Sequence, residues 1–318
     1  MKLSLFPRYA AEIWRHLLVS ANYHAGNYQD AIWLVGDGRS GTTWLSELLN
    51  GDAAYRDMFE PFHPSFVRGM THLPPYPYQR PGQDEPAFTA LAEAVFTGKF
   101  RNGRVDAANR RLRYRGLMIK DVQANLFLAW AVARFPQIKP VFLLRHPFAV
   151  AVSKRNVKGG IWLQDPKTFL TRGDLVTDHL KPFVTLIENV SDDFFEHQVM
   201  IWAIVNYVPL QQLRKGQVTP VFYEQLLSNP QTLLPPLLQQ TRGDLTPEAV
   251  AAIMGKIARP SKTAFQGSHV TGKRNPLNAW QDQITDAQLK RGLAILEAFG
   301  LNRLYAASAM PLVTDPFV

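Results

Sequence analysis

Short apolar runs alternate with segments of helical periodicity along most of this chain. Buried strands are predicted at 31–35, 55–59, 116–120, 139–144 and 217–222. Helices are predicted at 9–20, 43–50, 122–135, 147–156, 194–213 and 286–299, with a proline-interrupted helical segment after the last strand. Strands and helices that alternate in this way are typical of an α/β protein. We therefore expect a three-layer α/β/α fold with a mainly parallel central sheet.

Two long insertions interrupt the alternation. Residues 61–115 begin with a stretch at 61–86 that is rich in proline and aromatic residues, and they end with six arginines between 101 and 115. Residues 157–193 are polar and predict irregular structure. We expect one domain over 1–318, in which the insertions leave the sheet and return to it.

Composition indicates a folded chain. Of its 318 residues, 46% are hydrophobic and 19% are charged, which suffices for a sizeable core. The absence of cysteine excludes disulfide scaffolds, cysteine-ligated metals and thiol catalysis, and it fits a reducing compartment. No signal peptide is predicted, and the longest apolar stretch is far below the roughly 18 residues that span a bilayer. We expect a soluble, cytoplasmic protein whose helix at 9–20 packs on the domain, with contact to a membrane surface as the alternative.

The net charge points to an anionic partner. Thirty-five lysines and arginines against 26 acidic residues give a formal charge of +9. Nucleotides, sulfated or carboxylated sugars, nucleic acids and membrane surfaces all meet this requirement. Nucleic acid is disfavoured, because the charged motifs lie at strand ends and not along one exposed helix.

A glycine-rich loop after the first strand is the most informative feature. It reads Gly36-Asp37-Gly38-Arg39-Ser40-Gly41-Thr42-Thr43 and leads into a helix. Backbone N–H groups and the helix dipole at such a junction bind a phosphate or sulfate. The spacing matches the nucleotide-binding P-loop, but Thr42 stands where the lysine of that motif is required, and Arg39 brings its positive charge three residues earlier. An ordinary ATPase or kinase is therefore disfavoured.

A second anion site is predicted after the strand at 139–144. Arg145 follows that strand at its carboxyl end, where open α/β sheets bind ligands. Ser153 lies eight residues later, in the helix that Pro147 begins. A guanidinium group in this position suits a phosphate dianion.

Together these motifs resemble the sulfotransferases that use 3′-phosphoadenosine-5′-phosphosulfate (PAPS). The stretch from Gly38 to Leu45 resembles their 5′-phosphosulfate loop, and its Arg-Ser-Gly is nearer the carbohydrate and protein-tyrosine branches than the cytosolic small-molecule branch, which has Lys-Ser-Gly. The resemblance covers roughly residues 31–60, 116–156, 218–230 and 270–305. It implies a P-loop NTPase-like fold, PAPS as co-substrate, adenosine 3′,5′-bisphosphate (PAP) as product, and no metal requirement.

The resemblance also implies roles for individual residues. The phosphosulfate side of the donor would be bound by Gly38, Arg39, Ser40, Gly41, Thr42, Thr43 and Trp44. The 3′-phosphate would be bound by Arg145 and Ser153, joined by Gly272, Lys273 and Arg274. Tyr223 would lie near the adenine, in a Tyr-Glu-Gln-Leu segment whose Gln225 departs from the aspartate of the family.

A base must take the proton of the acceptor hydroxyl. Glu60, followed by Pro61 at the end of the second strand, resembles the glutamate that does so in carbohydrate sulfotransferases. His63 is the competitor, because its ordinary pKa suits a base at neutral pH. The histidine of the cytosolic branch is missing from Lys120-Asp121-Val122, where Lys120 is expected to contact the bridging oxygen. Arg39 and the loop amides would stabilise the leaving phosphate.

The insertions are expected to select the acceptor. Phe62, Tyr76 and Tyr78 are candidates to stack on sugar rings, and the arginines between 101 and 115 are candidates to hold an anionic polymer. These features favour a carbohydrate or polysaccharide hydroxyl, while a lipid, a small alcohol and a tyrosine stay open. A kinase and a nonenzymatic polyanion-binding protein are the alternatives from other classes.

Overall fold

The computed structural model describes residues 10, 13–14, 16–18, 20–21, 28–67, 69–157, 162–243, 245–259 and 275–317. Its centre is one sheet of five parallel strands: β1 (Ala31–Val35), β2 (Tyr55–Phe59), β3 (Gly116–Asp121), β4 (Ile138–Leu144) and β5 (Thr219–Phe222). Their order across the sheet is β2-β3-β1-β4-β5. The predicted α/β class, the parallel sheet and all five predicted strands are confirmed.

Helices surround the sheet. The longer ones are α2 (Thr42–Leu49), α3 (Pro86–Phe96), α4 (Leu128–Arg134), α5 (Pro147–Arg155), α8 (Phe194–Gln212), α9 (Tyr223–Ser228), α10 (Pro230–Arg242), α11 (Pro247–Met254) and α12 (Asp286–Ala298). Short helical turns are η1 (Asn125–Phe127), η2 (Pro166–Thr171), α6 (Gly173–Leu175), η3 (Val176–Leu180), η4 (Lys181–Phe183), α7 (Val184–Glu188), η5 (Gln281–Gln283) and η6 (Leu301–Arg303). In the part of the chain described here, no helix is both long and apolar enough to cross a bilayer.

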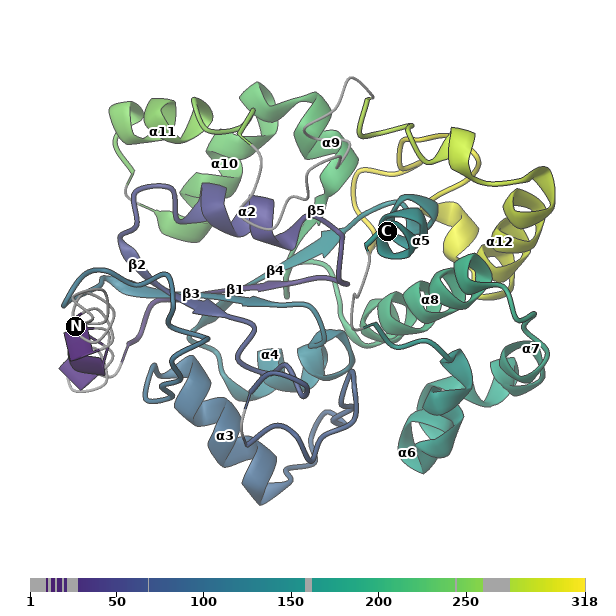
Figure 1. Cartoon of the computed structure of the whole chain (residues 1–318), viewed down its shortest axis with the longest axis horizontal. Coiled ribbons are helices and arrows are strands. Elements are labelled where there is room, and N and C mark those ends of the chain that lie inside the picture. Colours follow the sequence, from purple (N-terminus) through teal and green to yellow (C-terminus); the bar gives the residue numbers. More distant parts are fainter. Residues whose placement is uncertain are drawn as a thin grey trace, which may run out of the picture.

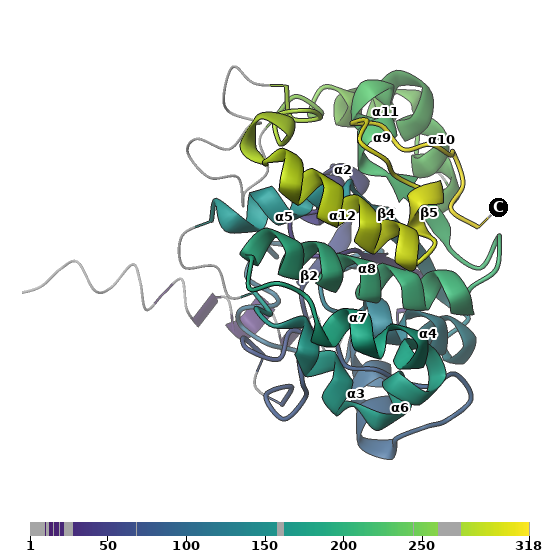
Figure 2. The ribbon, with the colours of Figure 1, turned by 90° about the vertical axis from the view of Figure 1, so that its right-hand side faces the viewer.

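Helices cover both faces of the sheet. Because successive strand residues point to opposite sides, each strand contributes to both cores. Ile32 and Leu34 of β1 join one core cluster with α2, α9 and α10, which lie above the sheet in Figure 1. Trp33 and Val35 join the larger cluster on the other face, where α3 and α4 lie below the sheet. On that same side α8 packs against α5 and α12, as Figure 2 shows. The two clusters form the three-layer arrangement.

Three details of the predicted elements differ from the structure. The segment at 122–135 opens with the 3₁₀ turn η1 and becomes α-helical only at Leu128. Helix α3 was not predicted, because Pro86 at its first turn resembled one more breaker of the proline-rich stretch. Within the segment at 157–193, residues 166–188 are not irregular, since a succession of helical turns from η2 to α7 occupies them. The polar composition of this segment indicated irregular structure and gave no sign of these turns.

The N-terminal helix is present where the structure describes it. The described residues between 10 and 21 are helical, and Leu18 is buried. Ile13, Trp14 and Leu17 are exposed, so this segment shows an apolar side away from the core.

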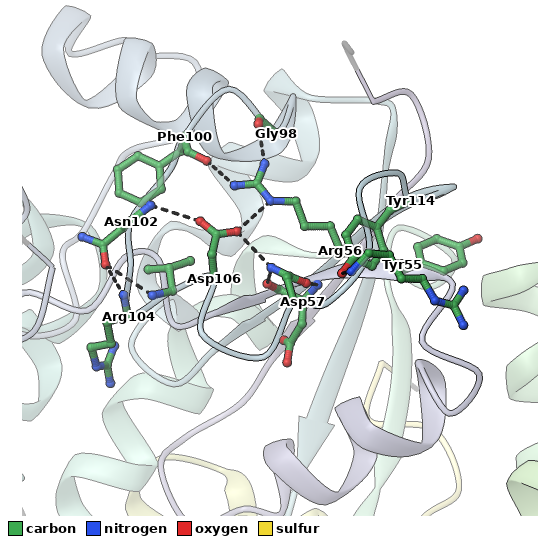
Figure 3. Close-up of polar contacts among 12 residues, drawn as sticks. Tyr55, Arg56, Asp57, Gly98, Phe100, Asn102, Arg104, Asp106 and Tyr114 are labelled. Atoms are coloured by element: carbon green, nitrogen blue, oxygen red, sulfur yellow. Dashed lines mark hydrogen bonds and ion pairs between the residues drawn. The ribbon is translucent and has the colours of Figure 1, made fainter. Parts of the chain in front are cut away.

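A buried ion pair holds the end of the first insertion in place (Figure 3). The Nε of Arg56, on β2, donates to Asp106 at 2.7 Å, and both side chains are almost completely buried. Arg56 also donates to the carbonyls of Gly98 at 2.6 Å and Phe100 at 2.7 Å. Asn109 bridges Asp106 and the backbone of Asp57. Residues 98–109 are therefore an ordered loop fixed to the edge strand.

We predict that Arg56→Met destabilises the fold by about 3–5 kcal/mol, because it leaves the Asp106 carboxylate buried without its cation. Urea unfolding measures this loss. The control is Arg113→Met, an exposed arginine of the same insertion, whose cost should stay within about 0.5 kcal/mol. Equal costs for the two variants would show that the ion pair does not hold the insertion.

Candidate functional site

The glycine-rich loop joins β1 to α2 at the carboxyl edge of the sheet. Arg39 has φ 72° and Gly41 has φ 94°, so the loop adopts left-handed backbone at two positions. A Cβ on Gly41 would lie 2.6 Å from the ring of Tyr223, which leaves room for glycine only. Helix α2 begins without a side-chain cap, so the loop presents uncapped N–H groups at the helix N-terminus.

Polar side chains of the loop are buried beside these N–H groups. Ser40, Thr42 and Thr43 are each less than 10% exposed. The Ser40 hydroxyl is buried and has no hydrogen-bond partner among the described residues. A buried polar atom without a partner is costly, so a ligand that forms a hydrogen bond with this hydroxyl would be favoured here.

Two arginines meet beside the loop. The Nε of Arg39 donates to the Ser153 hydroxyl at 3.1 Å, and Arg145 donates to the Arg39 carbonyl at 2.9 Å. Burial, and then the positive charge of Arg145, lowers the pKa of Arg39. The Nε of Arg145 is buried without a partner in the described chain. Two guanidinium groups held together in this way favour a shared anionic ligand.

Aromatic side chains pack next to Arg145 and the glycine-rich loop. The Arg145 guanidinium lies 4.4 Å from the centre of the Tyr223 ring. Trp44 packs edge-on against Tyr223 at 5.5 Å between ring centres and donates its Nε1 to the Ile257 carbonyl at 3.1 Å. Tyr223 therefore contacts the loop, the second arginine and Trp44 at once.

The structure thus brings Gly38, Arg39, Ser40, Gly41, Thr42, Thr43, Trp44, Arg145, Ser153 and Tyr223 into one region. Gly272, Lys273 and Arg274 lie outside the described residues. The chain that follows them does approach the site, because Arg145 reaches the Pro276 carbonyl at 3.5 Å.

Glu60 lies at the same edge of the sheet, two strands from β1. Its backbone has φ 54°, a left-handed conformation that is uncommon for glutamate. One carboxylate oxygen accepts from Lys120 at 2.5 Å and the other from Arg104 at 3.1 Å. Burial alone would raise the pKa of Glu60, but Lys120 and Arg104 outweigh it and hold the pKa below its usual value. Glu60 is therefore ionised at neutral pH.

Lys120 itself is almost fully buried at the end of β3. Its register with Phe59 of β2 and Leu34 of β1 puts it between Glu60 and the glycine-rich loop. Burial lowers the pKa of Lys120, and Glu60 opposes that shift. The next residue, Asp121, accepts from the Trp33 indole at 2.9 Å, and burial raises the pKa of Asp121 to about 7.

His63 lies one turn beyond Glu60. It is 5% exposed, its Nδ1 accepts from the Ser65 N–H at 3.2 Å, and its Nε2 contacts the Gln123 amide. Burial lowers the pKa of His63 to about 4, and Glu60 offsets the shift only in part. At neutral pH His63 is therefore uncharged, near Glu60 and its partners Lys120 and Arg104.

A buried cluster behind the loop was missed from the sequence. Asp37 accepts from Lys154 at 3.0 and 2.7 Å and from the Tyr76 hydroxyl at 2.5 Å. The signal was available in principle, because a carboxylate inside a loop that is predicted to bind an anion requires a neutralising partner. Nothing in the sequence indicated that Lys154 and Tyr76 were that partner.

Two expectations about the acceptor side are wrong. Phe62 is fully buried among Trp33, Phe88 and Phe127, and Tyr76 is 5% exposed, so neither ring is available to stack on a sugar. Tyr78 is half-buried and donates its hydroxyl to Asp178 at 2.7 Å. These aromatic residues stabilise the insertion and the core.

The arginines between 101 and 115 do not act as one set. Arg104 binds Glu60, and its guanidinium lies 4.4 Å from the centre of the Phe66 ring. Arg110 and Arg111 donate to backbone carbonyls of Asn109 and Asp52, respectively. Only Arg104 is therefore linked to the candidate base by these contacts.

Comparison with known proteins adds a weak structural likeness. No family model and no curated protein matches the chain. Among solved structures, the sulfotransferase domain from the curacin biosynthetic pathway aligns with 85% of this chain and 97% of its own, at 14% identity and a TM-score of 0.39. A likeness at this level assigns no activity, so the functional proposal rests on the residues of the site. Within the described chain, no group of three or more histidine or acidic side chains has the arrangement of a metal site.

We predict that His63 stays neutral through the physiological range, because burial holds its pKa near about 4. Unfolding restores the ordinary histidine pKa of about 6.5. His63 therefore lowers the free energy of unfolding only when the pH falls below that value. NMR of ¹³C-labelled histidine should show no titration of His63 between pH 5.5 and 8.5. A midpoint near 6.5 would contradict the burial and return His63 to consideration as the base.

Proposed function

We propose that this protein is a sulfotransferase that moves the sulfuryl group of PAPS to an acceptor hydroxyl. The observation that carries the proposal is the contact of Arg39 with both Ser153 and Arg145 beside the glycine-rich loop. Because of that contact, the glycine-rich loop lies beside Arg145 and Ser153, and the sequence predicts an anion site at each. A nucleotide with anionic groups at both its 5′ and its 3′ position matches such a site. A kinase is disfavoured, because Thr42 takes the position of the P-loop lysine.

The donor would be bound along the loop. The loop N–H groups, the Ser40 hydroxyl and Thr43 would bind the phosphosulfate, and Arg145 with Ser153 would bind the 3′-phosphate. Lys273 and Arg274, with Gly272, are proposed to complete the 3′ side. Tyr223 and Trp44, which pack against each other, would border the adenine.

Glu60 is proposed as the base. In the reaction the acceptor oxygen forms a bond to sulfur while the bond from sulfur to the 5′-phosphate oxygen breaks, and the acceptor proton passes to the Glu60 carboxylate. Because Lys120 and Arg104 lower its pKa, Glu60 is a weak base, and we expect it to take the proton as the attack acidifies the hydroxyl. Arg39 and the loop amides would stabilise the leaving phosphate, with Lys120 next to the bridging oxygen.

A carbohydrate or polysaccharide is the acceptor that we favour. The support is the Arg-Ser-Gly wording of the loop and the Glu60-Pro61 pair, both of which resemble the carbohydrate branch. The exposed side of Arg104 beside Glu60 suits an acceptor that carries an anionic group. Lipids, small alcohols and tyrosine belong in the same acceptor screen.

The test compares donors directly. Purified protein is incubated with [³⁵S]PAPS or [γ-³²P]ATP and a panel of carbohydrate, lipid, alcohol and tyrosine acceptors, and the products are identified by mass spectrometry. We expect label transfer from PAPS alone, and we expect it to persist in EDTA because no step of the proposed mechanism uses a metal. Transfer from ATP, or strict dependence on a divalent metal, would contradict the proposal.

We predict that Glu60→Gln lowers turnover at least about 100-fold, because glutamine cannot accept the proton. The affinity for PAP, measured by calorimetry, should change by no more than about threefold, since Glu60 contacts neither the glycine-rich loop nor Arg145 and Ser153, which are proposed to bind the two phosphates. The control is Glu93→Gln, an exposed glutamate of α3, which should behave as the unaltered protein. Near-normal turnover of Glu60→Gln would move the role of base to His63 or Asp121.

A further inference from the structure

A carboxylate lies inside the loop that is proposed to bind the donor. Asp37 is 1% exposed and is separated from Arg39 by one residue only. An anion that binds the loop N–H groups is repelled by a bare carboxylate at this distance. The loop therefore works as an anion site only if Asp37 is neutralised.

Lys154 supplies the neutralising charge. Its Nζ contacts both oxygens of Asp37, at 3.0 and 2.7 Å, and both side chains are at most 1% exposed. Lys154 follows Ser153 in α5. The same helical turn therefore carries the lysine that pairs with Asp37 and the hydroxyl that accepts from Arg39. Trp162 covers the pair, at 5.9 Å from Lys154 and against the backbone of Gly38.

The third partner comes from the acceptor side. Tyr76 belongs to the proline-rich insertion, and its hydroxyl donates to Asp37 at 2.5 Å. Burial raises the pKa of Tyr76 well above its usual value, so the hydroxyl keeps its proton and stays a donor. Its backbone has φ 53°, and Arg172 fixes that backbone by donating to the carbonyls of Tyr76 and Pro75, each at 2.6 Å. Arg172 lies in the second insertion, so both insertions are connected to the loop.

We infer that Asp37, Lys154 and Tyr76 form a positioning cluster through which the acceptor-side insertions set the affinity of the loop for the donor. This inference rests on the proposed function. Lys154 and Tyr76 together spread the charge of Asp37 away from the bound phosphosulfate. A shift of the Tyr76 segment removes one hydrogen bond from the carboxylate and returns negative charge to the loop.

The cluster would couple the affinities of the donor and the acceptor. Any acceptor that moves the Tyr76 segment changes donor affinity, and thermodynamic reciprocity requires that the donor change acceptor affinity by the same factor. The two substrates are then coupled through a contact that touches neither of them directly.

The experiment measures PAP affinity by calorimetry in variants that contact no proposed donor group. Tyr76→Phe removes one hydroxyl, and we expect the dissociation constant of PAP to rise about tenfold, because the Asp37 carboxylate, without this donor, repels the bound anion more strongly. Tyr78→Phe is the matched control, because Tyr78 lies in the same insertion as Tyr76 and also donates its hydroxyl to a carboxylate, that of Asp178. It should leave PAP affinity unchanged.

A second pair of variants tests the neutralisation itself. Lys154→Met leaves the Asp37 charge unpaired and should weaken PAP binding more than Tyr76→Phe does. The double variant Asp37→Asn with Lys154→Met removes both charges, and it should recover to within about threefold of the unaltered protein. Thermal unfolding without ligand checks that each variant is folded.

The outcomes separate the inference from the proposed function. If the unaltered protein does not bind PAP, both fail. If it binds PAP and Tyr76→Phe matches Tyr78→Phe, the inference alone is overturned. It is also overturned if the double variant binds as weakly as Lys154→Met, because Lys154 would then bind the donor itself.

Discussion

Burial of like charges at the edge of the sheet is the constraint on which the site depends. Arg145 donates to the Arg39 carbonyl, and burial, followed by the positive charge of Arg145, lowers the pKa of Arg39. Like charges this close repel each other, and the Tyr223 ring beside Arg145 and the Ser153 hydroxyl bound to Arg39 help to hold them in place. The Ser40 hydroxyl and the Arg145 Nε, for which the described part of the chain offers no hydrogen-bond partner, belong to this arrangement. On the proposed function, a ligand with two anionic groups would neutralise these charges.

The parallel sheet explains why distant residues meet there. Parallel strands in register end at one edge, so Glu60 after β2, Lys120 near the end of β3, the glycine-rich loop after β1 and Arg145 after β4 lie at the ends of four neighbouring strands. Three of the described non-glycine residues with positive φ, namely Arg39, Glu60 and Tyr76, belong to this region. Backbone strain of this kind persists only where the surrounding contacts enforce it. The strain is concentrated in the loop, the candidate base and the cluster that connects them to the insertions.

The sequence predicted the strands and the loop because both depend on local signals. Apolar runs mark Ala31–Val35 and Ile138–Leu144, and the glycines of the loop mark a backbone that other residues rarely adopt. The Asp37–Lys154–Tyr76 cluster depends on tertiary packing across 117 and 39 residues of separation, which no local pattern records. Phe62 and Tyr76 were misjudged for the same reason, since a proline-rich segment gives no sign of which aromatic side chains enter the core.

The central claim is that one ligand occupies both anion-binding features. Calorimetric titration with PAP and with adenosine 5′-monophosphate, which lacks the 3′-phosphate, tests it most directly. We expect PAP to bind at least about tenfold more tightly, because Arg145 gains a charge-assisted contact only with PAP. Equal affinity for the two nucleotides would contradict the account, since Arg145 and Ser153 would then not bind a 3′-phosphate.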